Sequence, residues 1–396
     1  MPEKTYIRIL FSLTLSLSGI FLLHICSVSA AAQNPIRIGA TVSLEGKYTS
    51  LSYMVKNGYE LWVDEINKRG GLLDRKVELV LYDDKSDKEL ATQLYEKLIT
   101  VDKVDLVLSP YGSPLTIAAA EVTDRNGYVL LAGSASSTEI WQQGFTYVFG
   151  VYSTADRYFL GFLDLAAQSG MKQVAVIYED STFNISAASG VRKWAELFGL
   201  ETIFFEKIND YKEDLLPIIK SLSSLVPDAL IFCGYPPAGY HLLKLLEKQN
   251  FKPDGLAMTI IPAMPDFYNN VGPFAENIFG SSQWEADERL PFPGTAAFIN
   301  SFLAKTGMKP SYQACSSYSA CQILERAILQ AGTIDHEKIR GFITNLDTVT
   351  IMGRFKVDFS GSQIGHNPIL IQWQKGRKEI VYPTKMQTAP AFFPQP

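Results

Sequence analysis

The chain has 396 residues, of which 47% are hydrophobic, and its 36 basic and 41 acidic residues leave a formal net charge of −5. Because both signs are interspersed along the sequence, this balance disfavours nucleic acid and anionic membrane surfaces as partners. The length exceeds what one hydrophobic core usually serves, so we expect two domains.

Residues 1–32 are predicted to be a cleaved secretory signal peptide. Lys4 and Arg8 precede the apolar run Ile9–Ile25, and small residues follow it. A basic start, an apolar middle and a small-residue exit are typical of such signals, and the run is shorter than the about 20 residues of a spanning helix. The prediction places the protein in the periplasm, without stable membrane insertion.

Two alternatives remain for this N-terminal segment. The first is an uncleaved membrane anchor. The second is lipidation at Cys26, which is disfavoured because Ile25 stands where a lipidated cysteine expects a small residue.

Beyond the signal, short apolar runs rich in β-branched residues alternate with segments of helical periodicity. The predicted strands span 36–42, 77–81, 104–108, 128–131, 173–178, 202–205, 229–233, 256–260, 278–284, 355–358 and 368–373. The predicted helices span 53–68, 88–99, 115–125, 159–168, 187–198, 215–222, 240–249, 298–305, 316–331 and 336–345.

Strands that alternate with helices through short loops predict parallel sheets covered by helices on both faces. The alternation runs through two series, which predicts an α/β protein of two similar, Rossmann-like lobes. Residues 384–396 contain Pro390 and Pro394, and this tail is predicted to be disordered.

Three cysteines follow the predicted cleavage site, too few for a disulfide-built scaffold. Cys233 ends an apolar run and is predicted to be a buried strand thiol. On one helix Cys315 and Cys321 would lie on different faces, too far apart to bridge. A disulfide between them requires that Cys315 precede the helix, and both possibilities remain open.

No catalytic, metal or cofactor motif is complete. Gly46-Lys47 lacks the first glycine and the hydroxyl residue of a phosphate loop. The cluster of Asp83, Asp84 and Asp87 lacks the glycine and terminal glutamate of a calcium loop, which indicates a solvated turn. The histidines have no paired metal spacing, and no Gly-x-Ser-x-Gly elbow is present. We therefore expect neither an enzyme nor a cofactor.

Two loops, Tyr111–Thr116 and Ala132–Ser137, each connect a strand end to a helix start. In open parallel sheets ligands bind beyond the carboxyl ends of the strands. Free N–H groups at a helix start suit an anion such as a carboxylate, and serine hydroxyls add donors. The structural alternative is that these serines only cap helices.

The chain from Ile36 to about Trp373 resembles type I periplasmic binding proteins of the leucine/isoleucine/valine-binding family, the substrate-binding components of branched-chain amino acid ABC transporters. The resemblance rests on motifs near the start of the predicted mature chain. These are Gly46, Asn57–Leu61, Asp64–Asn67, Gly70-Gly71 and Tyr82–Asp84. It implies two lobes joined by three crossings, near 151–154, 282–285 and 360–365.

The resemblance implies lobe 1 at 34–151 plus 285–360 and lobe 2 at 152–284 plus 361–383. It also implies a ligand-binding cleft between the lobes, closed by a hinge motion. By position in the family pattern, the ligand-binding residues are expected to be Ser113, Ser134, Ser136, Phe183 and Tyr235, and Tyr111 of the first loop is expected to join them.

One departure from the family pattern concerns the ligand. Amino-acid binders of this family place an acidic residue after the strand predicted at 256–260, where this chain has Ile260-Ile261-Pro262. Either Asp266, Glu285 or another acid substitutes, or the ligand has no α-amine. Ser86 and Gly112 occupy the positions of the family's first-lobe disulfide.

The expected function is therefore a periplasmic receptor for a small carboxylate, a branched-chain amino acid or a related organic acid. The resemblance implies delivery of the ligand to an ABC-type membrane permease, and we expect the protein to be a monomer. The alternative is a sensory or regulatory module that binds an amide, urea or aromatic acid.

Overall fold

The structure is a computed structural model that describes residues 34–393. The predicted signal peptide lies outside these residues. No helix within them is both long enough and apolar enough to cross a membrane.

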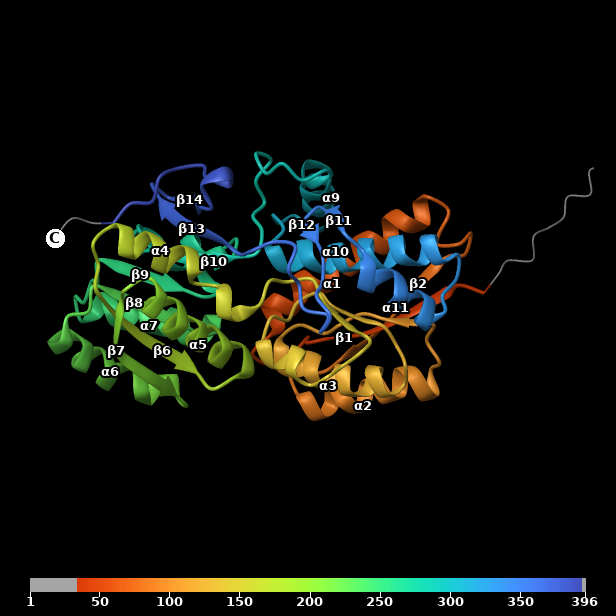
Figure 1. Ribbon diagram of the computed structural model, residues 1–396, viewed down its shortest axis with the longest axis horizontal. Coiled ribbons are helices and arrows are strands. Elements are labelled where there is room, and N and C mark those ends of the chain that lie inside the picture. The colour runs from red at the N-terminus through yellow and green to blue at the C-terminus, as the bar shows by residue number, and fades with distance from the viewer. Residues whose placement is uncertain (1–33, 394–396) are drawn as a thin grey trace, which may run out of the picture. The chain divides into compact units, whose positions relative to one another are not determined.

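Helices and strands alternate as predicted, and Figure 1 shows them gathered around two main sheets. The strands are β1 Ile36–Val42, β2 Val77–Asp83, β3 Leu106–Val107, β4 Leu130–Ala132, β5 Val148–Gly150, β6 Gln173–Glu179, β7 Glu201–Ile208, β8 Ala229–Cys233, β9 Gly255–Met258, β10 Phe279–Ser282, β11 Thr348–Thr350, β12 Gly353–Phe355, β13 Ile369–Gln374 and β14 Arg377–Tyr382. The α-helices are α1 Thr49–Lys68, α2 Lys88–Glu96, α3 Ser113–Arg125, α4 Leu160–Gln168, α5 Thr182–Leu197, α6 Tyr211–Leu225, α7 Pro236–Lys248, α8 Phe267–Val271, α9 Thr295–Thr306, α10 Tyr312–Ala331 and α11 His336–Asn345.

The first main sheet has the order β2-β1-β3 and is parallel; β4 and β5 form a separate parallel pair. The second has seven strands in the order β14-β13-β10-β9-β8-β6-β7, parallel from β10 to β7. Its interior strand β8 is buried at every residue, as expected for a sheet covered on both faces. The predicted α/β class with parallel sheets is confirmed.

The three predicted crossing segments are bonded to one another. The Gln283 side chain accepts from the Ser153 N–H and donates to the Ser153 carbonyl, both over 3.1 Å. From the third segment, the Gln363 amide donates to the Val151 carbonyl at 3.3 Å. Buried amide side chains thus join the three segments, while the lobe boundaries themselves stay a prediction.

Residues 384–393, the described part of the predicted tail, make specific contacts. Phe392 exchanges hydrogen bonds with the Gln372 side chain, and Phe393 stacks on Phe279 at 4.9 Å between ring centroids. One sequence-based expectation is wrong. Asp84 is not in a solvated turn, because it is fully buried and accepts from Thr41 Oγ1 and Ser43 Oγ.

The cysteine alternatives are resolved by the start of α10, which begins at Tyr312 rather than near residue 316. Cys315 and Cys321 therefore both lie inside this helix, and they are buried free thiols. Cys233 is also free and buried, at the end of β8, as predicted.

His336 joins α11 to the first sheet. Its Nδ1 accepts from the Val129 N–H at 3.1 Å, and its Nε2 lies 3.0 Å from the Asp105 carbonyl. Because Nδ1 must be unprotonated to accept, the ring is neutral and Nε2–H donates. Burial lowers the pKa of His336 below its usual 6.5.

This lowered pKa predicts a pH-dependent contribution to stability. The folded state favours the neutral ring, so the contribution is fully present above about pH 6.5 and is lost as the pH falls through the folded pKa. Urea unfolding from pH 8 to pH 5 should show a decline that is smaller in His336→Gln. An equal decline in both proteins would contradict this role.

Candidate functional site

A small cavity lies where several strand ends meet helix starts. Only about 10 Å³ remains free within it, about the space of one water. Its wall is made by twelve residues: Tyr111, Gly112, Ser113, Ser134, Ala135, Ser136, Tyr152, Tyr158, Phe183, Tyr235, Ile260 and Tyr312. All six predicted ligand-binding residues are among them; their contact with a ligand stays a prediction.

The two predicted loops are bonded to each other at the cavity. The Gly112 N–H donates to the Ser134 carbonyl at 3.0 Å. Ser113 Oγ accepts from the N–H groups of Ser136 and Ser137, at 3.2 and 3.1 Å. Ser113 therefore does not cap the helix; its hydroxyl instead holds the second loop against the start of α3.

The start of α3 suits an anion. Gly112 precedes the helix with φ +91°, a left-handed conformation that favours glycine, and no side chain caps the helix. The first turn has no acidic residue, which leaves the positive end of the helix dipole uncompensated. The nearby Ser134 hydroxyl is buried and has no partner among the described residues.

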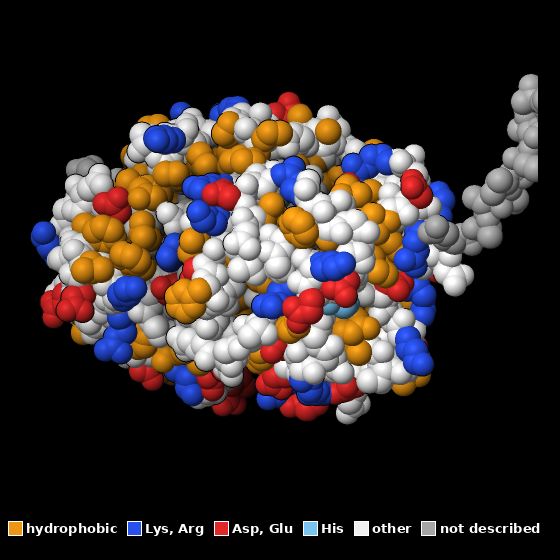
Figure 2. All heavy atoms as spheres, turned by 45° about the vertical axis from the view of Figure 1, so that its right-hand side comes forward, with side chains coloured by type: hydrophobic (Ala, Val, Ile, Leu, Met, Phe, Trp, Pro, Cys, Tyr) orange, Lys and Arg blue, Asp and Glu red, His pale blue; other side chains and the backbone are white. Residues whose placement is uncertain are grey.

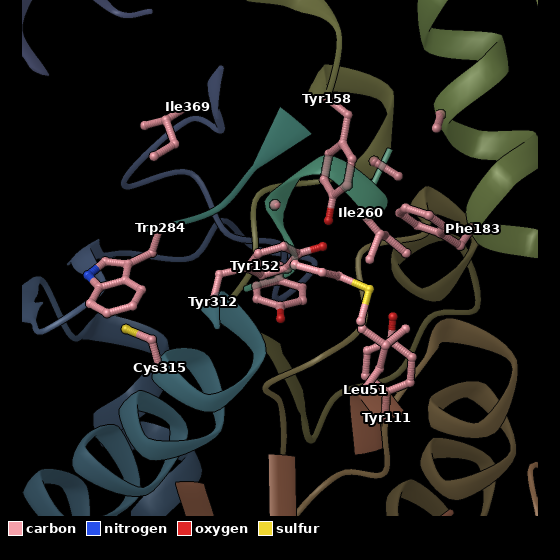
Figure 3. Packing of buried hydrophobic residues seen from close by; sticks show 14 of the residues in the cluster. Leu51, Tyr111, Tyr152, Tyr158, Phe183, Ile260, Trp284, Tyr312, Cys315 and Ile369 are labelled. Carbon is pink, nitrogen blue, oxygen red and sulfur yellow. The ribbon is translucent and has the colours of Figure 1, made fainter. Parts of the chain in front are cut away.

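Tyrosines supply most of the remaining wall, and Figure 3 shows Tyr111, Tyr152, Tyr158 and Tyr312 around one space with Phe183 and Ile260. The Tyr158 hydroxyl lies 3.2 Å from Ser136 Oγ, and Tyr152 accepts from Ser316 Oγ at 3.0 Å. Burial raises the pKa of Tyr158 to about 12 and those of Tyr111, Tyr152 and Tyr312 well above 10. These hydroxyls therefore remain protonated donors at neutral pH.

Tyr48 completes the aromatic layer beside the cavity. Its ring meets those of Tyr111 and Tyr235 edge-on, with centroid separations of 5.6 and 5.1 Å. The Tyr48 N–H donates to Ser86 Oγ, and Ser86 Oγ donates to the Glu45 carbonyl. The loop after β2 thereby positions the Gly46–Tyr48 loop.

Helix α5 carries Phe183 and contacts the second predicted loop directly. Ser137 Oγ donates to the Thr182 carbonyl at 3.1 Å, and the Thr138 N–H donates to Ser186 Oγ at 3.1 Å. The loop that holds Ser134 and Ser136 is thus hydrogen-bonded to the helix that places Phe183.

None of the twelve wall residues, all of which lie within the described residues, has a charged side chain. Ile260 occupies the wall after β9, where the family pattern has its acid. Asp266 bonds to Asn270 and does not border the cavity. Glu285 pairs with Lys378 at 2.5 Å, although its Oε1 is buried without a partner and its charge acts on Tyr312.

Glu179 is a further acid close to the wall. Its Oε2 accepts from the Tyr235 N–H at 2.5 Å, so it lies behind Tyr235. Burial raises the pKa of its carboxyl, and the Lys47 ammonium partly opposes that shift. Glu179 therefore anchors the start of α7 rather than facing the cavity.

Tyr152, Tyr158, Tyr312 and Ile260 were not predicted as wall residues. Tyr152 lies in the first crossing and Tyr158 follows it, and Tyr312 begins a helix some 200 positions after Ser113. Their positions relative to the predicted strand ends were only a weak indication that these residues line the cavity. No cluster of three metal-ligating side chains exists among residues 34–393.

Comparison with known proteins identifies similar chains. Residues 35–378 match the family described as periplasmic binding protein. The leucine-, isoleucine-, valine-, threonine- and alanine-binding protein of Pseudomonas aeruginosa is 24% identical over 358 residues, 87% of this chain and 91% of that protein.

Solved structures are similar over comparable lengths. A solute-binding protein of an ABC transporter from R. palustris, in complex with benzoate, has a TM-score of 0.77 at 20% identity, covering 91% of this chain and 98% of that one. The substrate-binding protein LivJ from Streptococcus pneumoniae, in complex with isoleucine, has a TM-score of 0.77 at 21% identity, covering 88% and 100%.

Proposed function

This chain belongs to the periplasmic binding protein family, whose members bind solutes and are not enzymes, and from that premise we propose a transport receptor for a small carboxylate without an α-amine. The receptor works in the periplasm and delivers its ligand to an ABC-type permease. The ligand binds in the cavity between the α3 start and α5, with Ser113, Ser134, Ser136, Tyr111, Phe183 and Tyr235 as contacts.

The observation that carries this proposal is the uncharged wall around Ile260. Burying an unpaired ammonium costs several kcal/mol. This cost would cancel most of the binding free energy of about 8 kcal/mol that corresponds to micromolar affinity. A carboxylate is accommodated by N–H groups and hydroxyls at the α3 start. The five wall tyrosines and Phe183 favour a flat aromatic acid.

A branched-chain amino acid is the second candidate. It is favoured by the unpartnered Oε1 of Glu285, whose charge acts on the wall residue Tyr312. The pairing of Oε2 with Lys378 neutralises this carboxylate, so we rank an amine-free acid first.

Calorimetric titration of the purified protein tests the ranking. We expect benzoate to bind more tightly than leucine and isoleucine, and benzamide to bind weakly because it lacks the carboxylate. Binding of the amino acids alone would overturn the proposal in favour of the second candidate. Binding of benzamide alone would overturn both.

Ser113→Ala should weaken binding of the preferred carboxylate about tenfold or more. Charge-assisted hydrogen bonds contribute about 1.5–3 kcal/mol, and the hydroxyl also holds the loop of Ser136. Ser113→Pro should weaken binding further by removing the backbone N–H. Ser221→Ala, on the exposed side of α6, is the control. Unchanged affinity in both Ser113 variants would reject this site.

A further inference from the structure

The first turn of α10 forms a second polar region beside the cavity. Tyr312 borders the cavity, and its neighbours Ser311 and Gln313 are 4% and 1% exposed. Helix α10 is 20 residues long, and its first turn has neither a side-chain cap nor an acidic residue. Its N–H groups therefore keep the positive end of a long helix dipole.

Polar atoms at this turn are buried without partners. Within residues 34–393, neither Oε1 nor Nε2 of Gln313 has a hydrogen-bond partner, and neither does Ser311 Oγ. Gln313 lies beside the hydroxyl of Tyr111, which is itself a wall residue. Buried amides are almost always hydrogen-bonded in folded proteins, so both ends of an unpaired amide beside the wall residue Tyr111 indicate a bonding group that the ligand supplies there.

The chemistry of this turn defines that group. An amide that offers a donor and an acceptor matches a hydroxyl, which also offers both. A second carboxylate is disfavoured because the wall carries no cation to compensate it, and an ammonium is disfavoured by the helix dipole. A neutral hydroxyl fits this turn, Gln313 and the protonated Tyr111.

We propose that Gln313, with the first turn of α10, selects a hydroxylated aromatic acid over the unsubstituted acid. This inference rests on the proposed function, since the carboxylate is held at the α3 start. The hydroxyl is received at the α10 start beside Tyr111, where Gln313 lies next to the wall without being one of its twelve residues. Gln313 is thus a specificity-determining residue of the cavity.

The test compares benzoate with 2-, 3- and 4-hydroxybenzoate and their methoxy analogues by calorimetry. In the natural protein we expect one hydroxybenzoate to bind about tenfold more tightly than benzoate, because the analogue without a hydroxyl leaves the amide unpaired. Its methoxy analogue should lose that gain. Equal or weaker binding of all three hydroxybenzoates would overturn the inference without use of any variant.

Gln313→Met should abolish the preference for the hydroxyl, measured in that variant as the ratio of hydroxybenzoate affinity to benzoate affinity. The matched control is Ser319→Ala, which removes another buried, unpartnered polar group from the same helix, away from the wall. A preference that survives Gln313→Met would overturn the inference and leave the proposed function standing. Failure of the natural protein to bind any of these acids would overturn both.

Discussion

Replacement of Ile260 by glutamate should abolish binding of an aromatic acid and permit binding of leucine or isoleucine. Ile260 is 2% exposed and borders a cavity whose wall carries no charge. A carboxylate about 5 Å from the ligand carboxylate repels it by about 3 kcal/mol at an effective dielectric constant of about 20, or about 100-fold in affinity. The same carboxylate would pair with the ammonium of an amino acid.

Ile260→Gln separates charge from shape, because it has nearly the same size as glutamate without the charge. We expect Gln to weaken aromatic-acid binding far less than Glu does and to gain no amino-acid binding. Titration of benzoate and leucine into the natural protein and both variants measures this exchange. Equal losses in the two variants would show that shape, rather than charge, decides the ligand class.

Local sequence patterns predicted the fold well because a buried parallel sheet requires them. Ala229–Cys233 is apolar at every position, and the structure covers it on both faces. Sequence reasoning also singled out Tyr111–Thr116 and Ala132–Ser137, because ligands of open parallel sheets bind beyond strand ends. The structure brings these two loops together although β3 and β4 lie in separate sheets. The hydrogen bond from the Ser136 N–H to Ser113 Oγ holds the two loops against each other.

Other parts of the cavity depend on contacts between distant segments. Helix α10 was expected to begin near residue 316, and its earlier start at Tyr312 places that ring in the wall and Gln313 beside Tyr111. Strand β14 was missed because Arg377–Tyr382 is strongly polar at its start and pairs at the edge beside β13. No local pattern states which distant surface such a segment will cover.

Lys378→Met should be the most destabilising of the substitutions considered. Lys378, on β14, donates to Glu285 in the second crossing segment and to the carbonyl of Ala263, at 2.5 and 2.8 Å. Methionine preserves the apolar stem and leaves Glu285, which is 7% exposed, as a buried carboxylate without a partner. Breaking a buried pair costs about 3–5 kcal/mol, and we expect about 3 because the lysine side chain is 21% exposed.

Urea unfolding followed by circular dichroism measures this loss of stability. Arg377→Met is the matched control, because Arg377 is the neighbouring residue on β14 and its side chain is 78% exposed. The control should change the free energy of unfolding by less than about 0.5 kcal/mol. The double variant Lys378→Met, Glu285→Gln should recover much of the loss, since no charge is then left buried. A double variant as unstable as Lys378→Met would show that the Ala263 bond, rather than the ion pair, joins β14 to the turn after Ile260.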